Sequence, residues 1–230
     1  MAQFEERVSA AAVLFLPFVV FFLALWSIAP PTSAHILASD PLVQLVNSYA
    51  GIWAIPLVAA LPALAWTVVL PPSRAALGRA VPGVLGGLAV AAVGLPLLRL
   101  LAGPTLPGFV PPEESAFAGI TLGVGAGIME EAVFRLGLLS VVFLAGCRVL
   151  GRRRAGAVAV VLTAFAFALS HELGPGAGTF DARYFAMRFM APGCVMSVLF
   201  FRPGPSFVVT LHSAAHVGIA LLFADAATAG

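Results

Sequence analysis

Long apolar stretches without a single charged residue dominate this sequence. Residues 8–39 carry no charge, and several later gaps between charges are also long. A helix needs about 20 apolar residues to cross the hydrocarbon core of a bilayer. Only 10% of the residues are charged, against about 25% in ordinary soluble domains. A water-soluble fold cannot bury so much apolar surface, and the chain is therefore predicted to be an all-α, polytopic transmembrane helix bundle.

The sequence predicts about seven membrane-spanning helices, within a range of six to eight. The first ends before Pro30 and Pro31, because proline stops a helix. A cleavable signal peptide is disfavoured, because Glu5 and Glu6 dilute the positive charge at the start. No linker or repeat divides the chain, so residues 1–230 are expected to form one transmembrane domain. The predicted spans are 8–28, 51–70, 81–100, 116–146, 155–170, 184–201 and 206–223.

The arginines predict the orientation of these helices. All 12 basic residues are arginine, and most lie between apolar stretches. Cytoplasmic loops collect basic residues, and the arginines of 74–79, 148–154 and Arg202 fall in alternate loops on the side of Arg7. The amino terminus is therefore predicted to be cytoplasmic and the carboxyl terminus outside. The use of arginine without lysine indicates a GC-rich genome, and hence a bacterial inner membrane. The position of the arginines between apolar stretches argues against nucleic-acid binding.

Three ionisable residues lie near the middle of the fourth predicted span: Glu130, Glu131 and Arg135. A charge in a span costs at least ~2.5 kcal/mol on insertion scales, so each needs a partner or a function. Glu131 and Arg135 are four residues apart and share a helix face, where they are expected to form an ion pair. Glu130 points about 100° away and has no cation three or four residues along, which suits a general base. A purely structural ion pair between helices remains an alternative for Glu131 and Arg135.

Three of the four histidines fall on apolar helices. His171 ends the fifth span, four residues after Phe167, which is interpreted as a packing residue. His212 and His216 share one face of the seventh span. By the predicted topology His171 lies toward the outer end of its span and His212 nearer the inner end. A tilt, a broken helix or misplaced span boundaries must account for the difference in depth. An interfacial histidine at 171, and a helix–helix hydrogen-bonding pair at 212 and 216, remain alternatives.

In sequence order, Glu-Glu-x-x-x-Arg at 130–135, Phe-x-x-x-His at 167–171 and His-x-x-x-His at 212–216 resemble the CPBP family of CAAX-type glutamic intramembrane proteases. That family includes the eukaryotic endopeptidase that trims prenylated CAAX proteins, and many bacterial relatives. The resemblance covers residues 116–223, which are expected to form the catalytic core. It points to the bacterial branch, with a carboxyl-terminal sorting-signal protease of the myxosortase type as the narrower candidate.

The resemblance implies six catalytic-site residues, namely Glu130, Glu131, Arg135, His171, His212 and His216. Glu130 and His171 would activate a water molecule for attack on a peptide carbonyl, and the pair Glu131 and Arg135 would orient the site. His212 would donate to the developing oxyanion, assisted by the residue at 216. Histidine stands at 216 where the family often has asparagine, and a neutral imidazole donates only one hydrogen bond.

The expected activity is hydrolysis of a peptide bond near the carboxyl end of a membrane-associated protein or peptide, within the lipid bilayer and without metal or other cofactor. Three alternatives stay open. Histidines four residues apart, with a carboxylate, also suit a zinc-dependent membrane protease, although the signature His-Glu-x-x-His is absent. The others are a non-catalytic bacteriocin-immunity or scaffold protein, and a proton-coupled transporter.

Small residues precede the glutamates of the fourth span. Gly123, Gly125 and Gly127 are expected to let neighbouring helices pack closely. The two cysteines, Cys147 and Cys194, lie in apolar surroundings and are interpreted as small hydrophobic residues. No disulfide framework is predicted.

Overall fold

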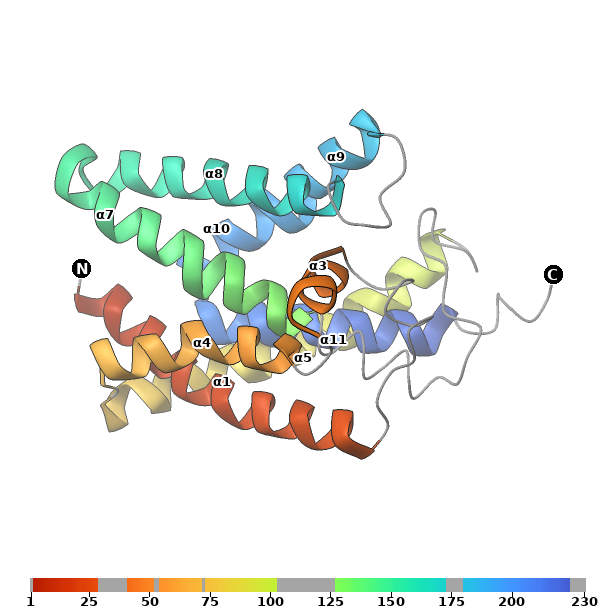
Figure 1. The fold of residues 1–230 in the computed structure, drawn as a ribbon, viewed down its shortest axis with the longest axis horizontal. Coiled ribbons are helices and arrows are strands. Elements are labelled where there is room, and N and C mark those ends of the chain that lie inside the picture. Colours follow the sequence, from red (N-terminus) through yellow and green to blue (C-terminus); the bar gives the residue numbers. More distant parts are fainter. Residues whose placement is uncertain are drawn as a thin grey trace.

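The computed structural model describes residues 2–28, 41–51, 54–71, 73–102, 127–172 and 180–223, and within these ranges every regular element is helical. The predicted all-α bundle is confirmed (Figure 1). Its elements are α1 (Ala2–Ile28), α3 (Pro41–Ala50), α4 (Ala54–Val69), α5 (Arg74–Ala102), η1 (Glu131–Leu139), α7 (Ser140–Leu150), α8 (Arg152–Glu172), α9 (Ala182–Arg188), η2 (Phe189–Val195), α10 (Met196–Phe201) and α11 (Pro205–Phe223).

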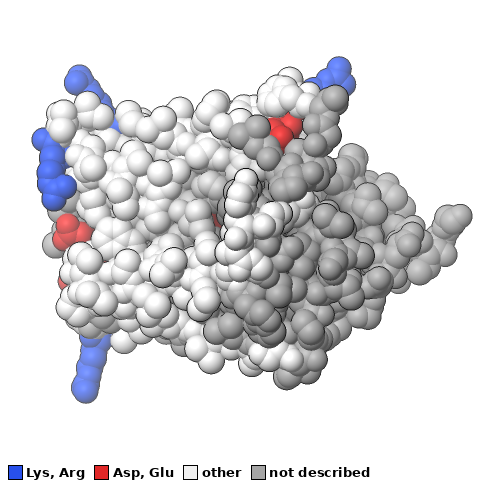
Figure 2. All heavy atoms as spheres, in the orientation of Figure 1, with Lys and Arg blue, Asp and Glu red and all other residues white. Residues whose placement is uncertain are grey.

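Four of the described helices are long and apolar enough to cross a membrane: Ala80–Leu101, Gly127–Leu150, Arg152–Glu172 and Ala182–Phe201. Their outward faces are apolar too, as at Leu85, Val93 and Val161, which are about half exposed or more. Charged side chains gather toward the ends of the molecule, and the visible surface between them is uncharged (Figure 2). An apolar band between charged ends is what a bilayer requires of a protein surface. The protein is a multi-pass membrane protein.

The structure adds one helix that was predicted as loop, α3. This segment contains Gln44, Asn47 and Ser48, so it offers no apolar run of spanning length. The segment is helical nevertheless. Its Gln44 side chain is buried, and the Ser48 hydroxyl donates a hydrogen bond to the Gln44 carbonyl at 2.8 Å. Residues 116–126 of the fourth predicted span, with Gly123 and Gly125, lie outside the described residues. The other predicted spans correspond to α1, α4, α5, α8, the helix 182–201 and α11.

The helix ends follow from local chemistry. Gly151 separates α7 from α8 at a φ of 73°, and Gly204 precedes α11 at a φ of 115°, a region that favours glycine. Asp181 caps α9, because its side chain accepts hydrogen bonds from the backbone amides of Arg183 at 2.8 Å and Tyr184 at 3.3 Å. These turns reverse the chain sharply and let successive helices pack side by side.

The helix Gly127–Leu150 lies at the centre of the described bundle and contacts α4, α8 and α11. Its η1 segment is a π-helix, a wider turn that often marks functional sites. The indole of Trp66 on α4 donates to the Leu136 carbonyl at 2.5 Å. A second π-helix, η2, interrupts the helix 182–201 and contains Pro192. Both widened segments pack against α8.

Helix α11 is held against α5 by glycines. A Cβ atom on Gly87 would lie 2.6 Å from the Phe207 carbonyl oxygen, and one on Gly83 would overlap the Ser206 hydroxyl. Gly83 and Gly87 form a Gly-x-x-x-Gly pattern, the small-residue spacing that lets membrane helices approach closely. This pattern was not among the predictions from the sequence, and it sets the position of α11 and of the histidines on it.

Substitution at this contact should separate α5 from α11. We expect Gly87→Ala to destabilise the protein by about 1–3 kcal/mol, because the added methyl meets backbone that cannot move cheaply. Gly94→Ala on the same helix is the matched control, since a Cβ there has nothing within 4 Å. Thermal unfolding of the detergent-solubilised chain measures the difference. Equal midpoints for the two variants would contradict the assigned packing.

Candidate active site

Glu130 lies where three helices meet. It is the last residue before η1, and its side chain is only 3% exposed. Its Oε1 atom is 3.8 Å from His171 Nε2 on α8, and its Oε2 atom is 3.6 Å from His212 Nε2 on α11. Each oxygen of one buried carboxylate therefore faces a different imidazole.

Glu131, the neighbouring acid, has a different environment. Its Oε1 atom is 3.0 Å from Arg135 Nη1 and 2.7 Å from His212 Nδ1. Neither Glu131 nor Arg135 has any exposed side-chain surface. The predicted ion pair is present, and it also fixes the ring of His212. Hydrogen bonds that involve an ionised group are about twice as strong as neutral ones, so the ring orientation is firmly held.

The two imidazoles present the same nitrogen to Glu130. His171 Nδ1 donates to the Phe167 carbonyl at 2.7 Å, because a carbonyl oxygen can only accept. His212 Nδ1 donates to the carboxylate of Glu131 for the same reason. Both Nε2 atoms then face Glu130 at separations longer than a hydrogen bond but within the reach of a bridging water.

Arg135 connects the site to the packing around it. Its guanidinium donates to the Pro192 carbonyl of η2 and lies over the Phe167 ring, 4.6 Å from the ring centroid. The Phe167 ring is in turn 4.6 Å from the His171 ring. Arg135 thus connects the central helix to η2 and, through Phe167, to α8. A cation over an aromatic face is stabilising, more so when desolvated.

A recessed turn between α10 and α11 brings His212 level with Glu130. The ring of Phe201, at the end of α10, is 4.9 Å from that of Phe143, which lies about three and a half turns from Glu130. The α10–α11 turn therefore lies deeper within the bundle than the α7–α8 turn, which is at its end (Figure 1). His212, early in α11, and His171, near the end of α8, reach the same depth by this recess.

His216 lies one turn beyond His212, and the two rings stack with centroids 4.9 Å apart. A Cβ on Gly127 would lie 3.3 Å from the His216 ring, so glycine there allows α11 to approach the central helix. The structure brings together Glu130, Glu131, Arg135, His171 and His212, with His216 stacked on the last of these.

Two carbonyl groups with a role in the site were not found from the sequence, those of Phe167 and Pro192. Phe167 was interpreted as packing, and its ring does pack, but its carbonyl also orients His171. A proline in the middle of an apolar span was the available signal for Pro192, because proline disturbs regular helix geometry.

Within the described ranges, no group of three or more histidine, cysteine, aspartate or glutamate side chains has the arrangement of a metal site. What the site offers chemically is a buried carboxylate with an imidazole nitrogen less than 4 Å from each of its oxygens.

Comparison with known proteins finds a similar family. Residues 112–218 match the family model described as type II CAAX prenyl endopeptidase Rce1-like. This segment, just under half of the chain, is similar to that family. The resemblance to CAAX-type proteases is thereby confirmed at the level of the family, and the family is a protease family. No curated protein and no solved structure matched the chain. The Rce1-like segment contains Glu130, His171 and His212, each on a different helix.

Removing the guanidinium should destabilise the Rce1-like segment. We expect Arg135→Met to cost about 3 kcal/mol or more, because it leaves the buried Glu131 carboxylate without its cation. The double change Glu131→Gln with Arg135→Met should recover part of that loss, since no uncompensated charge remains. Unfolding midpoints of the two proteins test this.

Arg148→Met is the control for that comparison, because Arg148 is an exposed arginine at the end of α7. It should change stability little. A single Arg135→Met variant as stable as this control would contradict the role assigned to the ion pair.

Proposed function

We propose that the protein is an intramembrane endopeptidase in which Glu130 and His171 activate a water molecule for attack on a peptide carbonyl. The observation that carries this proposal is the pair of separations from one buried carboxylate, 3.8 Å to His171 Nε2 and 3.6 Å to His212 Nε2. Similarity to the Rce1-like family supports peptide hydrolysis as the reaction.

A water molecule between Glu130 and His171 donates one hydrogen to Oε1 and the other to Nε2, since His171 uses its own proton on the Phe167 carbonyl. Both lone pairs of the water oxygen are then directed away from these acceptors. As the oxygen attacks the carbonyl carbon, an O–H bond breaks and the proton passes to Glu130. Glu130 returns that proton to the amide nitrogen when the C–N bond breaks, and no covalent enzyme intermediate forms.

His212 stabilises the oxyanion of the tetrahedral intermediate. Its Nδ1 proton is engaged by Glu131, so Nε2 can donate only when the ring is an imidazolium. The Glu131 carboxylate at 2.7 Å stabilises that cation, and Arg135 holds Glu131 in place. Glu131 and Arg135 are therefore positioning residues, and His216, stacked on His212, supports the ring.

The proposed substrate is a membrane-associated polypeptide cut near its carboxyl end. The site is buried within apolar helices, so the scissile bond must enter from the bilayer or from its surface. A bacterial inner membrane, with the amino terminus of the enzyme cytoplasmic, is the proposed setting, and carboxyl-terminal anchoring or sorting signals are the proposed substrates within it.

Substitution of Glu130 tests the mechanism. Glu130→Gln keeps the shape of the side chain and removes its basicity, so cleavage should fall about a hundredfold to ten-thousandfold. The measurement compares carboxyl-terminal peptides of the membrane proteome, by mass spectrometry, in cells of the source organism that carry either allele. Uncut carboxyl-terminal tails should accumulate in the variant.

Glu172→Gln is the matched control. Glu172 is next to His171 and accepts from the Asp181 amide at 3.2 Å, a bond that an amide oxygen retains. Normal processing with Glu130→Gln would overturn the proposal. If a chelator inhibited the wild-type enzyme and added zinc restored it, a metal mechanism would replace the one proposed.

Two replacements of His212 separate its two nitrogens. Glutamine places an amide N–H near the position of Nε2, and asparagine places one near Nδ1. If donation from Nε2 stabilises the oxyanion, His212→Gln should retain more kcat than His212→Asn, whose loss should approach about 100-fold to 1,000-fold. The opposite order would mean that the bond to Glu131 is the main contribution of His212.

A further inference from the structure

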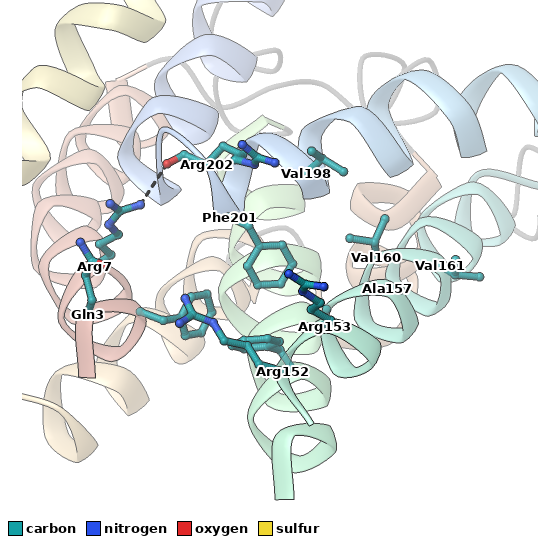
Figure 3. Close-up of a pocket in the computed structure, with 13 residues that line it drawn as sticks. Gln3, Arg7, Arg152, Arg153, Ala157, Val160, Val161, Val198, Phe201 and Arg202 are labelled. Atoms are coloured by element: carbon teal, nitrogen blue, oxygen red, sulfur yellow. Dashed lines mark hydrogen bonds between the residues drawn. The ribbon is translucent and has the colours of Figure 1, made fainter. Parts of the chain in front are cut away.

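A cavity of about 710 Å³ opens between α1, α7, α8 and α10, away from the catalytic residues. It is built at the recess that the α10–α11 turn leaves in one end of the bundle (Figure 3). Four arginines line it, Arg7, Arg152, Arg153 and Arg202. None of the described residues that line it is acidic. Glu5 and Glu6 lie nearby on α1 but are not part of the lining.

The positive charge of the cavity is unusually concentrated. Arg152 and Arg153 begin α8, whose first turn holds no acidic residue. The amino-terminal end of a helix carries partial positive charge, so cations there are unfavourable and an anion is favourable. Arg7 donates to the Arg202 carbonyl at 2.9 Å, which fixes α1 against the α10–α11 turn. An anion in the cavity would offset the repulsion among these groups.

Apart from Gln3, the rest of the lining is apolar. Val160, Val161 and Val198 line one side and Phe201 lies between Arg7 and Arg153 in Figure 3. A soluble anion such as phosphate has no apolar part that could contact this surface. A molecule that is anionic at one end and hydrocarbon at the other satisfies both halves of the lining at once. Arg152 and Arg153 lie at the start of α8, next to the α7–α8 turn at one end of the bundle (Figure 1). Lipid phosphates lie at the ends of the apolar band.

We propose that this arginine-lined cavity binds the phosphate of an anionic phospholipid, with the start of an acyl chain against the valines. Guanidinium groups bind phosphate through paired hydrogen bonds. A zwitterionic lipid fits less well, because its ammonium group would meet the same arginines. The volume is within the usual range for small-molecule sites, about 300–1,000 Å³, which suits a headgroup and part of one chain.

The test uses the full chain in nanodiscs of phosphatidylcholine, titrated with short-chain phosphatidylglycerol and followed by native mass spectrometry. We expect the double change Arg152→Gln with Arg153→Gln to weaken binding about tenfold or more. Its matched control is Arg148→Gln with Arg154→Gln, which removes the same charge at the same turn from exposed side chains outside the cavity. The control should bind nearly as the wild type does.

A second variant leaves every charge in place. Ala157→Trp fills the cavity from an exposed position on α8 and should weaken binding comparably. If the two arginine double variants lost lipid binding equally, general surface charge would explain the loss and the proposal would be overturned. Unchanged binding by Ala157→Trp would overturn it also. Inorganic phosphate that competes at the concentration of the lipid would assign the cavity to a soluble anion instead.

Discussion

One carboxylate oxygen, Oε1 of Glu131, determines the geometry of the whole site. It is shared by Arg135 at 3.0 Å and His212 at 2.7 Å, and it thereby joins the central helix to α11. Without this bond the His212 ring could rotate, and Nε2 would no longer face Glu130. Two adjacent glutamates consequently differ in environment, because their directions on the helix give one of them a cation and the other a pair of imidazoles.

The π-helical segments explain how such a shared contact is possible in an apolar bundle. Arg135 lies on η1 and donates to the Pro192 carbonyl on η2, so the two irregular segments meet at the guanidinium. A buried arginine is costly unless its hydrogen bonds are met. Here the Pro192 carbonyl accepts a hydrogen bond, and the Glu131 carboxylate and the Phe167 ring compensate the charge, although Nε has no hydrogen-bond acceptor among the described residues. Each of these groups comes from a different part of the chain, so the three parts are held in one arrangement.

Much of this was accessible from the sequence, for identifiable reasons. The apolar runs predicted the helices, because a bilayer fixes the length of a helix that crosses it. The spacing of Glu131 and Arg135 predicted the ion pair, because residues four apart lie on the same helix face. Helix α3 was not predicted, because its polar residues interrupt the apolar run. The equal depth of His171 and His212 could not be predicted, because it depends on the recessed turn beside Phe143 and Phe201. That turn is a tertiary contact with no local sequence signal. The catalytic roles of the six site residues stay predictions.

The charges of the site bear on the proposed mechanism. Glu130 and Glu131 together carry two negative charges and Arg135 one positive charge, all within side chains that are almost fully buried. An uncompensated charge is unfavourable in low dielectric, so one proton bound in the site restores neutrality. In the mechanism proposed above, His212 holds that proton. Glu130 takes a second proton from the water molecule and passes it to the departing nitrogen, so the net charge of the site is the same before and after the reaction.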